Sequence, residues 1–414
     1  MKAVILTYGS RGDVEPFFAL ANGLIRAGHD ALVVGPGTFS TLASERGIAF
    51  IPLPGDPEAV AADLVQVAGH SPWKMVHVVS KLILPIGAEV YHIAREVCRG
   101  ADVVVNSFLF TTGGPEIVDQ LGIPSFSAQL FPIFTATGDF PGVVTPDLPL
   151  GRKYRHLTHA ILEQVFWQGS RLLYRRVRRE NPDFPPLSGW PLAKERQPPV
   201  PVLYAYSRHV LPRPADWPDH AHVTGYWFRD ETEPHGIPEA LKSFLMNGPP
   251  PVYIGFGSVI AGDPARFARI AVKALNITGQ RGVLATGWGG LQAEELPEHV
   301  FAISDVPHSW LFPKMVAAVH HGGAGTTGAS LRAGIPTLIV PFTSDQPFWG
   351  RRVHHLGAGP APISPRRLNA QNLASAIREM VGDEAMRSRA ARLGEAIRME
   401  DGVGHAVSLI EAAR

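Results

Sequence analysis

The sequence has little that would tie it to a nucleic acid, a membrane or an oxidising compartment. Its 414 residues include one cysteine, Cys98, which cannot form an internal disulfide, so we interpret it as a small buried helix residue in a protein of a reducing compartment. The 38 lysine and arginine residues nearly balance the 37 aspartate and glutamate residues, which leaves a net charge of +1 and no general attraction to nucleic acid. No uncharged apolar stretch reaches the roughly 18 residues that span a bilayer. We therefore expect a soluble, cytoplasmic protein with no transmembrane segment and no nucleic-acid partner.

Glycine and proline, in contrast, are plentiful, with 42 and 38 residues. Together they stay below the roughly 25–30% that marks disordered chains, and the 45% of hydrophobic residues is enough for two sizeable cores at this length. The prolines gather between Pro182 and Pro251, and this stretch closes on Asn-Gly-Pro-Pro-Pro at 247–251. We interpret 216–251 as a proline-rich linker between two domains.

Short apolar runs alternate with helical patterns on both sides of this linker. Before it, we expect strands at 3–6, 31–34, 103–105 and 123–126. After it, we expect strands at 252–256, 282–285, 300–304, 316–319 and 337–340. The alternation predicts two doubly wound α/β domains with parallel sheets, at 1–215 and 252–395, whose strand ends face each other across a cleft. A C-terminal helix at 396–414 is expected to cross back to the first domain.

An arginine-rich segment at 152–179 has apolar residues at helical spacing. A basic amphipathic helix can lie transiently on a membrane or bind a partner. It can equally be a surface helix with a solvated basic face, and the sequence leaves both interpretations open.

A glycine-rich loop follows the apolar strand at 316–319 and opens a helix. Its residues are His320-His321-Gly322-Gly323-Ala324-Gly325-Thr326-Thr327. Glycines let the backbone approach a ligand, and the free N–H groups of a helix N-terminus attract anions. Thr326 or Thr327 can bind a phosphate oxygen or cap the helix, and a histidine here can donate a hydrogen bond to phosphate. The competing interpretation is a tight turn with capping threonines and a packed pair of histidines.

Two further segments of the same domain strengthen a ligand-binding interpretation. Gly255-Phe256-Gly257-Ser258 forms a second glycine turn after a strand, and Ser258 can reach a phosphate. Neither glycine turn matches the nucleotide-binding loop of ATPases or the dinucleotide fingerprint of dehydrogenases. Asp345-Gln346 follows another strand and can bind vicinal hydroxyls, as on a sugar ring, or can simply begin a helix.

The order of these motifs resembles that of the sterol and glycopeptide-antibiotic branch of the inverting nucleotide-sugar glycosyltransferases. The resemblance rests on the segments 9–16, 223–227, 255–258, 306–312, 320–327 and 345–349. It implies the GT-B fold of two Rossmann-like domains, in which the N-terminal domain binds the acceptor and the C-terminal domain binds the sugar nucleotide. The segments 56–100 and 131–190 match least, and in such enzymes they shape the acceptor pocket.

The resemblance also implies roles for individual residues. The donor diphosphate would be held by residues of the two glycine turns, namely Ser258, His321, Gly323, Gly325 and Thr326. Val306 would contact the base through its main chain, and Trp288 would flank the base. Asp345 and Gln346 would hold the sugar hydroxyls. No metal and no further cofactor is expected, because no His, Asp or Glu group has ligand spacing and the UDP-sugar is a co-substrate.

The catalytic base implied by the resemblance is Asp13, in the turn Gly12-Asp13-Val14-Glu15-Pro16. A carboxylate there can take the proton of an acceptor hydroxyl as it attacks the anomeric carbon, and burial would raise its pKa. The competing interpretation is an N-cap of the helix that follows. Arg11 can pair with Asp13 or with the donor phosphates, and the sequence does not choose.

We therefore predict an inverting O-glycosyltransferase that moves a hexose, glucose from UDP-glucose, to a lipophilic hydroxylated acceptor such as a sterol, flavonoid, polyketide or glycopeptide. The acceptor class rests on the resemblance and on apolar residues of the variable segments, which are Trp73, Met75, Leu82, Ile83, Phe108, Phe110, Phe131 and Phe134. The alternatives are a sugar-nucleotide 2-epimerase of similar fold and a non-catalytic sugar-nucleotide-binding partner protein.

Overall fold

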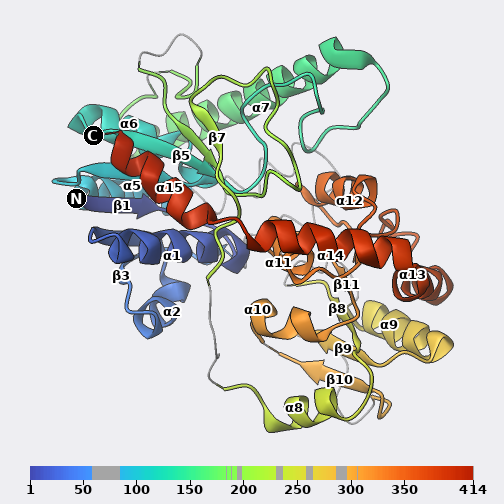
Figure 1. Cartoon of the computed structure of the whole chain (residues 1–414). Helices are drawn as coiled ribbons and strands as arrows, with labels where there is room; N and C mark the ends of the chain where they lie inside the picture. The colour runs from blue at the N-terminus through green and yellow to red at the C-terminus, as the bar shows by residue number, and fades with distance from the viewer. Residues whose placement is uncertain are drawn as a thin grey trace. The chain divides into compact units, whose positions relative to one another are not determined.

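The computed structural model describes residues 1–413 except 58–83, 183, 188, 194–197, 230–235, 258–263, 286–295 and 305 (Figure 1). The chain divides into two compact units. The first unit contains Met1–Arg208, Pro212–Phe228 and Asp401–Arg414, and the second contains His209–Leu211 and Arg229–Glu400.

The first unit is built on a parallel sheet with the strand order β3-β2-β1-β4-β5-β6-β7. Its strands are β1 (Lys2–Leu6), β2 (Asp30–Pro36), β3 (Ala49–Leu53), β4 (Val103–Asn106), β5 (Ser125–Gln129), β6 (Val202–Tyr204) and β7 (Ala221–Val223). Its helices are α1 (Arg11–Arg26), α2 (Ser40–Glu45), α5 (Gly87–Cys98), α6 (Gly113–Leu121), α7 (Gly151–Glu180) and α15 (Gly402–Ala412), with short 3₁₀ turns at η1 (Gly37–Phe39) and η2 (Phe108–Phe110).

The second unit is built on a five-stranded parallel sheet with the order β10-β9-β8-β11-β12. Its strands are β8 (Val252–Gly255), β9 (Gly282–Ala285), β10 (Val300–Ile303), β11 (Ala317–His320) and β12 (Thr337–Ile339). Its helices are α8 (Glu239–Met246), α9 (Pro264–Thr278), α10 (His308–Leu311), α11 (Ala324–Ala333), α12 (Gln346–His355), α13 (Ala370–Gly382) and α14 (Glu384–Arg398), with a 3₁₀ turn at η4 (Phe312–Lys314).

Both sheets are apolar on their two faces, as parallel sheets covered by helices require. In β8, Val252 and Ile254 pack into one core cluster, and Tyr253 between them packs into the cluster on the opposite face. The structure confirms the predicted fold class of two parallel-sheet α/β domains.

Two details differ from the expected domain boundaries. The segment expected as an irregular linker, 216–251, contains β7, which pairs with β6 in the first sheet, and α8 of the second unit. A three-residue strand between prolines is too short to produce a hydrophobic pattern. The second unit extends to Glu400, and only the residues from Asp401 onward join the first unit.

Helix α15 packs against α1 in the first unit, although nearly 400 residues separate the start of the two helices (Figure 1). The contact depends on Gly23 of α1, where an added Cβ would lie 2.2 Å from Cγ1 of Val403. A side chain at this position would push the two helices apart.

Cys98 is the fully buried last residue of α5, and burial raises the pKa of its thiol to about 12. The thiol is therefore a packing residue, as expected from the sequence, because a thiolate is needed for reactivity. None of the helices in the described part of the chain has both the length and the apolar character of a bilayer-spanning segment.

Candidate functional site

The glycine-rich loop of the second unit lies between β11 and α11, at the N-terminus of that helix. Gly322 has a φ of +94°, a conformation that side chains rarely adopt, and an added Cβ would lie 2.5 Å from Cγ2 of Ile339. Gly323 is the N-cap of α11. The backbone N–H groups of the first turn are therefore free of side-chain caps, which leaves the anion-attracting end of the helix available.

The two histidines of the loop have different environments. His320 is fully buried, its Nδ1 accepts a hydrogen bond from the N–H of Gly322 (3.1 Å), and its Nε2 lies 3.2 Å from Oγ of Ser330. Both ring nitrogens of His320 thus have protein partners. Burial lowers its pKa well below the ordinary value, so it is a neutral structural residue at pH 7.

His321 has a buried Nδ1 with no hydrogen-bond partner among the described residues. Its ring lies between two glycines, since a Cβ on Gly257 would approach Cε1 to 3.1 Å and a Cβ on Gly323 would approach Nε2 to 2.7 Å. Burial first, and then the charge of His308, lowers the pKa of His321 to about 4. A neutral imidazole held between two glycines at a helix N-terminus can donate one hydrogen bond to an anion.

The other predicted phosphate ligands lie in the first turn of α11. Gly325 is exposed, and an added Cβ there would meet nothing within 4 Å. Thr326 is half-buried, whereas Thr327 is fully buried and its Oγ1 has no partner among the described residues. Ser258 and Trp288 lie outside the described residues, so the structure does not place them.

The Asp345-Gln346 pair begins α12, and both residues are buried. Oδ2 of Asp345 accepts a hydrogen bond from Nε1 of Trp349 (2.7 Å). Oε1 of Gln346 accepts hydrogen bonds from the N–H groups of Phe342 (2.7 Å) and Thr343 (3.2 Å). These contacts fix the orientation of both side chains, and they use the carbonyl oxygen of Gln346 while its amide N–H groups have no described partner.

Residue Ser344 precedes this pair with a φ of +58°, which is uncommon for a residue with a side chain. Such backbone strain persists only where the surroundings fix it, and it is often found at binding sites. Val306 is buried against Leu311 and Phe312, so its packing fixes the position of the main chain that was expected to contact a base.

In the first unit, Asp13 is the third residue of α1, and Ser10 is the N-cap. Oδ2 of Asp13 accepts hydrogen bonds from the main-chain N (2.9 Å) and Oγ (2.8 Å) of Ser10. The N-cap of α1 is therefore Ser10, and the interpretation of Asp13 as the N-cap is wrong. Burial raises the pKa of Asp13, and the two hydrogen bonds from Ser10 only partly oppose this.

Arg11 forms an ion pair with Glu15 (Nε–Oε1, 3.0 Å) one turn further along α1. Arg46 binds the same carboxylate oxygen (2.8 Å). Burial alone would raise the pKa of Glu15, but the two guanidinium groups outweigh it and lower the pKa. Glu15 was not among the partners expected for Arg11 from the sequence, which were Asp13 and phosphate, although i,i+4 spacing on a helix favours the Arg11–Glu15 pair.

A cluster of half-buried aromatic side chains, which we call the aromatic cluster, also lies in the first unit. Phe108 and Phe134 stack with ring centroids 5.8 Å apart and planes at 14°, and Phe166 and Trp190 complete the contacts. Phe131 and Trp167 lie at its edge. Nε1 of Trp190 is buried without a partner among the described residues, and Phe134 has a φ of +70°.

The aromatic cluster unites three residues singled out in the sequence, Phe108, Phe131 and Phe134, with three that were not, Phe166, Trp167 and Trp190. Phe110 instead belongs to the core beneath the sheet. Trp73, Met75, Leu82 and Ile83 lie outside the described residues. Within the described residues, no group of three or more His, Cys, Asp or Glu side chains is arranged to hold a metal ion.

Two segments of the chain match known family models. Residues 3–137 match the Glycosyltransferase family 28 N-terminal domain. Residues 289–401 match the Erythromycin biosynthesis protein CIII-like, C-terminal domain.

The chain is also similar to curated sterol 3-beta-glucosyltransferases. It is 35% identical over 418 residues to one from Arabidopsis thaliana, with 98% of this chain and 67% of the relative covered. It is 35% identical over 438 residues to one from Cryptococcus neoformans, with 99% of this chain and 27% of the relative covered. The chain thus spans about a quarter to two thirds of the length of these relatives.

Solved structures of antibiotic glycosyltransferases share the fold. The glycosyltransferase of kitacinnamycin superposes with a TM-score of 0.70 at 20% identity, covering 99% of this chain and 98% of that one. The spinosyn rhamnosyltransferase superposes with a TM-score of 0.68 at 16% identity, covering 99% of this chain and all of that one.

Proposed function

The chain belongs to the sterol glucosyltransferase and antibiotic glycosyltransferase branch of the nucleotide-sugar glycosyltransferases, and from this premise we propose that it transfers a hexose from a UDP-sugar to a hydroxyl of a lipophilic acceptor. Glucose is the proposed hexose, and inversion at the anomeric carbon is the proposed outcome. The relatives are named as transferases, so the comparisons favour a transferase over the 2-epimerase and over the non-catalytic binding protein.

The observation that carries the proposal is the environment of His321. His321 has a buried Nδ1 with no partner among the described residues, and Nε2 of the same ring lies beside Gly323, the N-cap of α11, whose N-terminus has no side-chain cap. Phosphate oxygens would accept from the imidazole N–H and from the backbone N–H groups of Gly325 and Thr326. As the bond between the anomeric carbon and the phosphate oxygen breaks, the leaving diphosphate gains negative charge, and these donors would stabilise it.

Asp345 and Gln346 are proposed to bind the hydroxyls of the transferred sugar. Trp349 holds the Asp345 carboxylate, and two main-chain N–H groups hold the Gln346 amide, so both side chains are fixed before the sugar binds. Such pre-organisation lowers the entropic cost of binding. The main chain at Val306 is proposed to contact the uracil.

Asp13 is proposed as the general base. Its carboxylate would take the proton of the acceptor hydroxyl while the acceptor oxygen bonds to the anomeric carbon and the UDP departs with the electrons of the broken bond. A base of raised pKa takes a proton more readily, as long as the pH keeps it ionised. Metal is not required in this proposal, because hydrogen-bond donors of the protein would stabilise the charge of the diphosphate.

The aromatic cluster is proposed to bind the acceptor. Half-buried rings offer apolar surface to a polycyclic ligand, and Nε1 of Trp190 can donate a hydrogen bond to an oxygen on it. A lipophilic acceptor such as a sterol or a polyketide suits this composition. A cytoplasmic location, where UDP-sugars are made, stays a prediction.

The experiment that tests the function measures UDP release from UDP-glucose with and without sterols, flavonoids and macrolactones. Release that depends on one acceptor class supports the proposal and names the acceptor. Conversion of the sugar nucleotide without any acceptor would favour the epimerase. Binding of UDP with no turnover across the panel would favour the non-catalytic protein.

A further inference from the structure

Helix α7 is apolar on two separate faces. Its inner face packs on the first unit through Phe166 in the aromatic cluster and Val177 in the core beneath the sheet. Its outer face exposes four large apolar side chains to solvent, namely Leu157 (57% exposed), Ile161 (52%), Val165 (66%) and Leu172 (54%). A solvent-facing surface of a helix is normally polar. The packing of the first unit therefore does not explain why this face is apolar.

The four residues form one continuous stripe. Spacings of four, eight and fifteen residues from Leu157 place them within about a quarter of the helix circumference. The same line continues to Arg175 and Arg179 near the C-terminal end of α7, and both are exposed. We call these six residues the outer stripe of α7, which is apolar for most of its length and cationic at one end.

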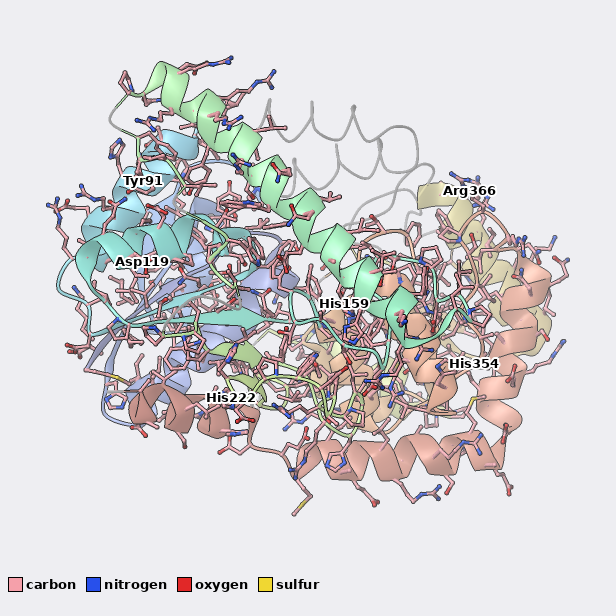
Figure 2. The ribbon with its side chains drawn as sticks, turned by 90° about the horizontal axis from the view of Figure 1, so that it is seen from above. Tyr91, Asp119, His159, His222, His354 and Arg366 are labelled. Atoms are coloured by element: carbon pink, nitrogen blue, oxygen red, sulfur yellow. The ribbon has the colours of Figure 1, made fainter. Side chains whose placement is uncertain are left out.

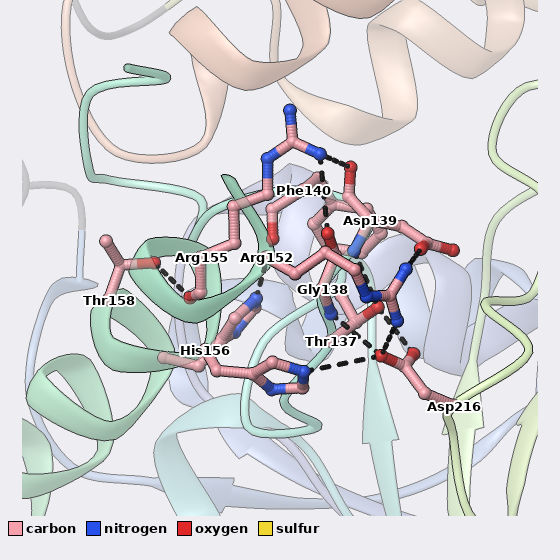
Figure 3. Close-up of polar contacts among 10 residues, drawn as sticks. Thr137, Gly138, Asp139, Phe140, Arg152, Arg155, His156, Thr158 and Asp216 are labelled. Carbon is pink, nitrogen blue, oxygen red and sulfur yellow. Dashed lines mark hydrogen bonds and ion pairs between the residues drawn. The ribbon is translucent and has the colours of Figure 1, made fainter. Parts of the chain in front are cut away.

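The beginning of α7 is fixed to the first unit by a polar network (Figure 3). Arg152 binds Asp139 (3.0 Å) and Asp216 (2.9 Å), and Asp216 also accepts hydrogen bonds from Thr137 and from the N–H of Gly138. Arg155 donates to the carbonyl oxygen of Asp139 (2.9 Å). The first turns are therefore anchored, with Arg152 and Arg155 bound to partners within the first unit.

A second anchor lies one turn further along α7. This anchor is His159, which is labelled in Figure 2. Its Nε2 lies 3.0 Å from the carbonyl oxygen of Phe140, and burial lowers the pKa of His159, so it stays neutral at pH 7. The helix is thus held from its inner side, and the outer stripe stays exposed.

Positive charge is concentrated on α7. The helix carries eight lysine and arginine residues against Glu163 and Glu180, a net charge of +6 in a chain whose total is +1. Four of the arginines, at 175, 176, 178 and 179, are exposed at the C-terminal end, away from the anchoring network. Any partner of this face must therefore accept both apolar side chains and guanidinium groups.

We propose that the outer stripe of α7 docks on an anionic lipid surface. The apolar side chains enter the boundary between headgroups and acyl chains, and the exposed arginines bind lipid phosphates, as in helices that lie in a membrane interface. A second copy of the chain fits less well, because pairing two such faces would bring like charges together. The proposal does not depend on the transferase activity.

The test is flotation of the full chain with vesicles of phosphatidylcholine containing phosphatidylglycerol, compared with phosphatidylcholine alone. We expect binding to the anionic vesicles that weakens as salt increases. Ile161→Ser with Val165→Ser should weaken the partition at least about tenfold by removing inserted apolar groups. Arg175→Gln with Arg179→Gln should weaken it about tenfold at low salt and reduce its salt dependence.

The matched control is Met246→Ser with Met399→Ser, which removes two apolar side chains that are 83% and 87% exposed elsewhere on the chain. This control should bind vesicles as the wild type does, and circular dichroism should show that all variants are folded. Equal loss of binding in the control and the stripe variant would overturn the proposal. So would a wild-type chain that stays unbound at low salt, or one that forms a dimer or binds an acidic protein through the stripe instead of vesicles.

Discussion

Ser10 donates two hydrogen bonds to one carboxylate oxygen of Asp13, from its main-chain N at 2.9 Å and its Oγ at 2.8 Å. The other oxygen, Oδ1, accepts no hydrogen bond from the described residues. The carboxylate is thereby fixed at the start of α1 with one oxygen able to accept a proton. The same arrangement forms the capping box of the helix and would orient the carboxylate of Asp13 for its proposed role as a base.

Replacing Asp13 by Asn should lower kcat by about 10²–10⁴-fold, because general base catalysis contributes about that much. The Asn oxygen can still accept from Ser10, so the helix start should remain intact. Steady-state kinetics with UDP-glucose and the acceptor identified from the panel measure the effect, and calorimetry should show UDP affinity within about twofold of the wild type. In the wild type, burial raises the pKa of Asp13, so activity should fall as the pH drops through a value above the ordinary aspartate range. A variant with normal kcat would refute the assignment.

Gly9 is required by the position of Asp13. Its φ is +140°, and an added Cβ would lie 2.6 Å from Oδ2 of Asp13. Gly9→Ala should therefore destabilise the first unit by about 1–3 kcal/mol and displace the carboxylate. The matched control is Gly12→Ala, where the nearest atom to an added Cβ is Oγ of Ser10 at 4.0 Å. Thermal unfolding of both variants measures the difference, and equal melting temperatures would contradict the prediction.

The sequence was informative where local rules decide the structure. Apolar runs marked β1, β2, β4 and β5 of the first sheet and all five described strands of the second, but not β3, β6 or β7. Glycines marked the turns after β8 and β11, because a positive φ favours glycine. The spacing of residues alone could not separate the roles of His320 and His321, and only the family resemblance assigned the phosphate to His321. Their difference comes from Ser330 and Gly257, which only the folded sheet brings to the two rings.

Contacts between distant segments account for most of what was missed. Phe166 and Trp190 join Phe108 only after α7 has packed on the first unit, and no spacing rule connects them. The strand β7 could not be recognised from three residues among prolines. In α7 the apolar residues were seen, but only the burial of Val177 and the exposure of Val165 sort them into two faces.

Truncation of the aromatic cluster should weaken acceptor binding. Phe134→Ala and Trp190→Phe are expected to raise the KM for the acceptor, the first by loss of apolar contact and the second by loss of the only polar donor on that ring. An increase of about tenfold is expected for Phe134→Ala, equivalent to about 1.4 kcal/mol. The KM for UDP-glucose serves as the internal control and should not change. Unchanged acceptor kinetics in both variants would place the acceptor elsewhere.

Gln346→Glu separates the structural oxygen of this side chain from its amide N–H groups. The carboxylate can still accept from the N–H groups of Phe342 and Thr343, so the start of α12 should be preserved. It can no longer donate to a sugar hydroxyl, and the KM for UDP-glucose should rise about tenfold, as for one lost hydrogen bond. Affinity for UDP itself should stay within about twofold, because UDP lacks the sugar. A loss of UDP affinity equal to the change in KM would contradict a sugar-binding role.

The stability of the free protein should depend on the protonation of His321. In the free protein burial lowers its pKa to about 4, below the ordinary value of about 6.5, so this group stabilises the fold fully above pH 6.5 and the contribution is lost as the pH falls toward 4. A shift of this size corresponds to about 3 kcal/mol at most. His321→Gln should therefore flatten the dependence of stability on pH between 6.5 and 4, measured by urea unfolding at each pH.

The same histidine should take up a proton when UDP binds, because diphosphate oxygens beside its ring favour the imidazolium and raise the pKa. Titration calorimetry at pH 5.5 in buffers of different ionisation enthalpy measures this uptake. We expect a fraction of a proton for the wild type and less for His321→Gln, with UDP bound more weakly by the variant. His320→Gln is not a suitable control, because His320 is buried with both nitrogens bonded. Equal uptake by wild type and His321→Gln would show that the diphosphate does not contact His321.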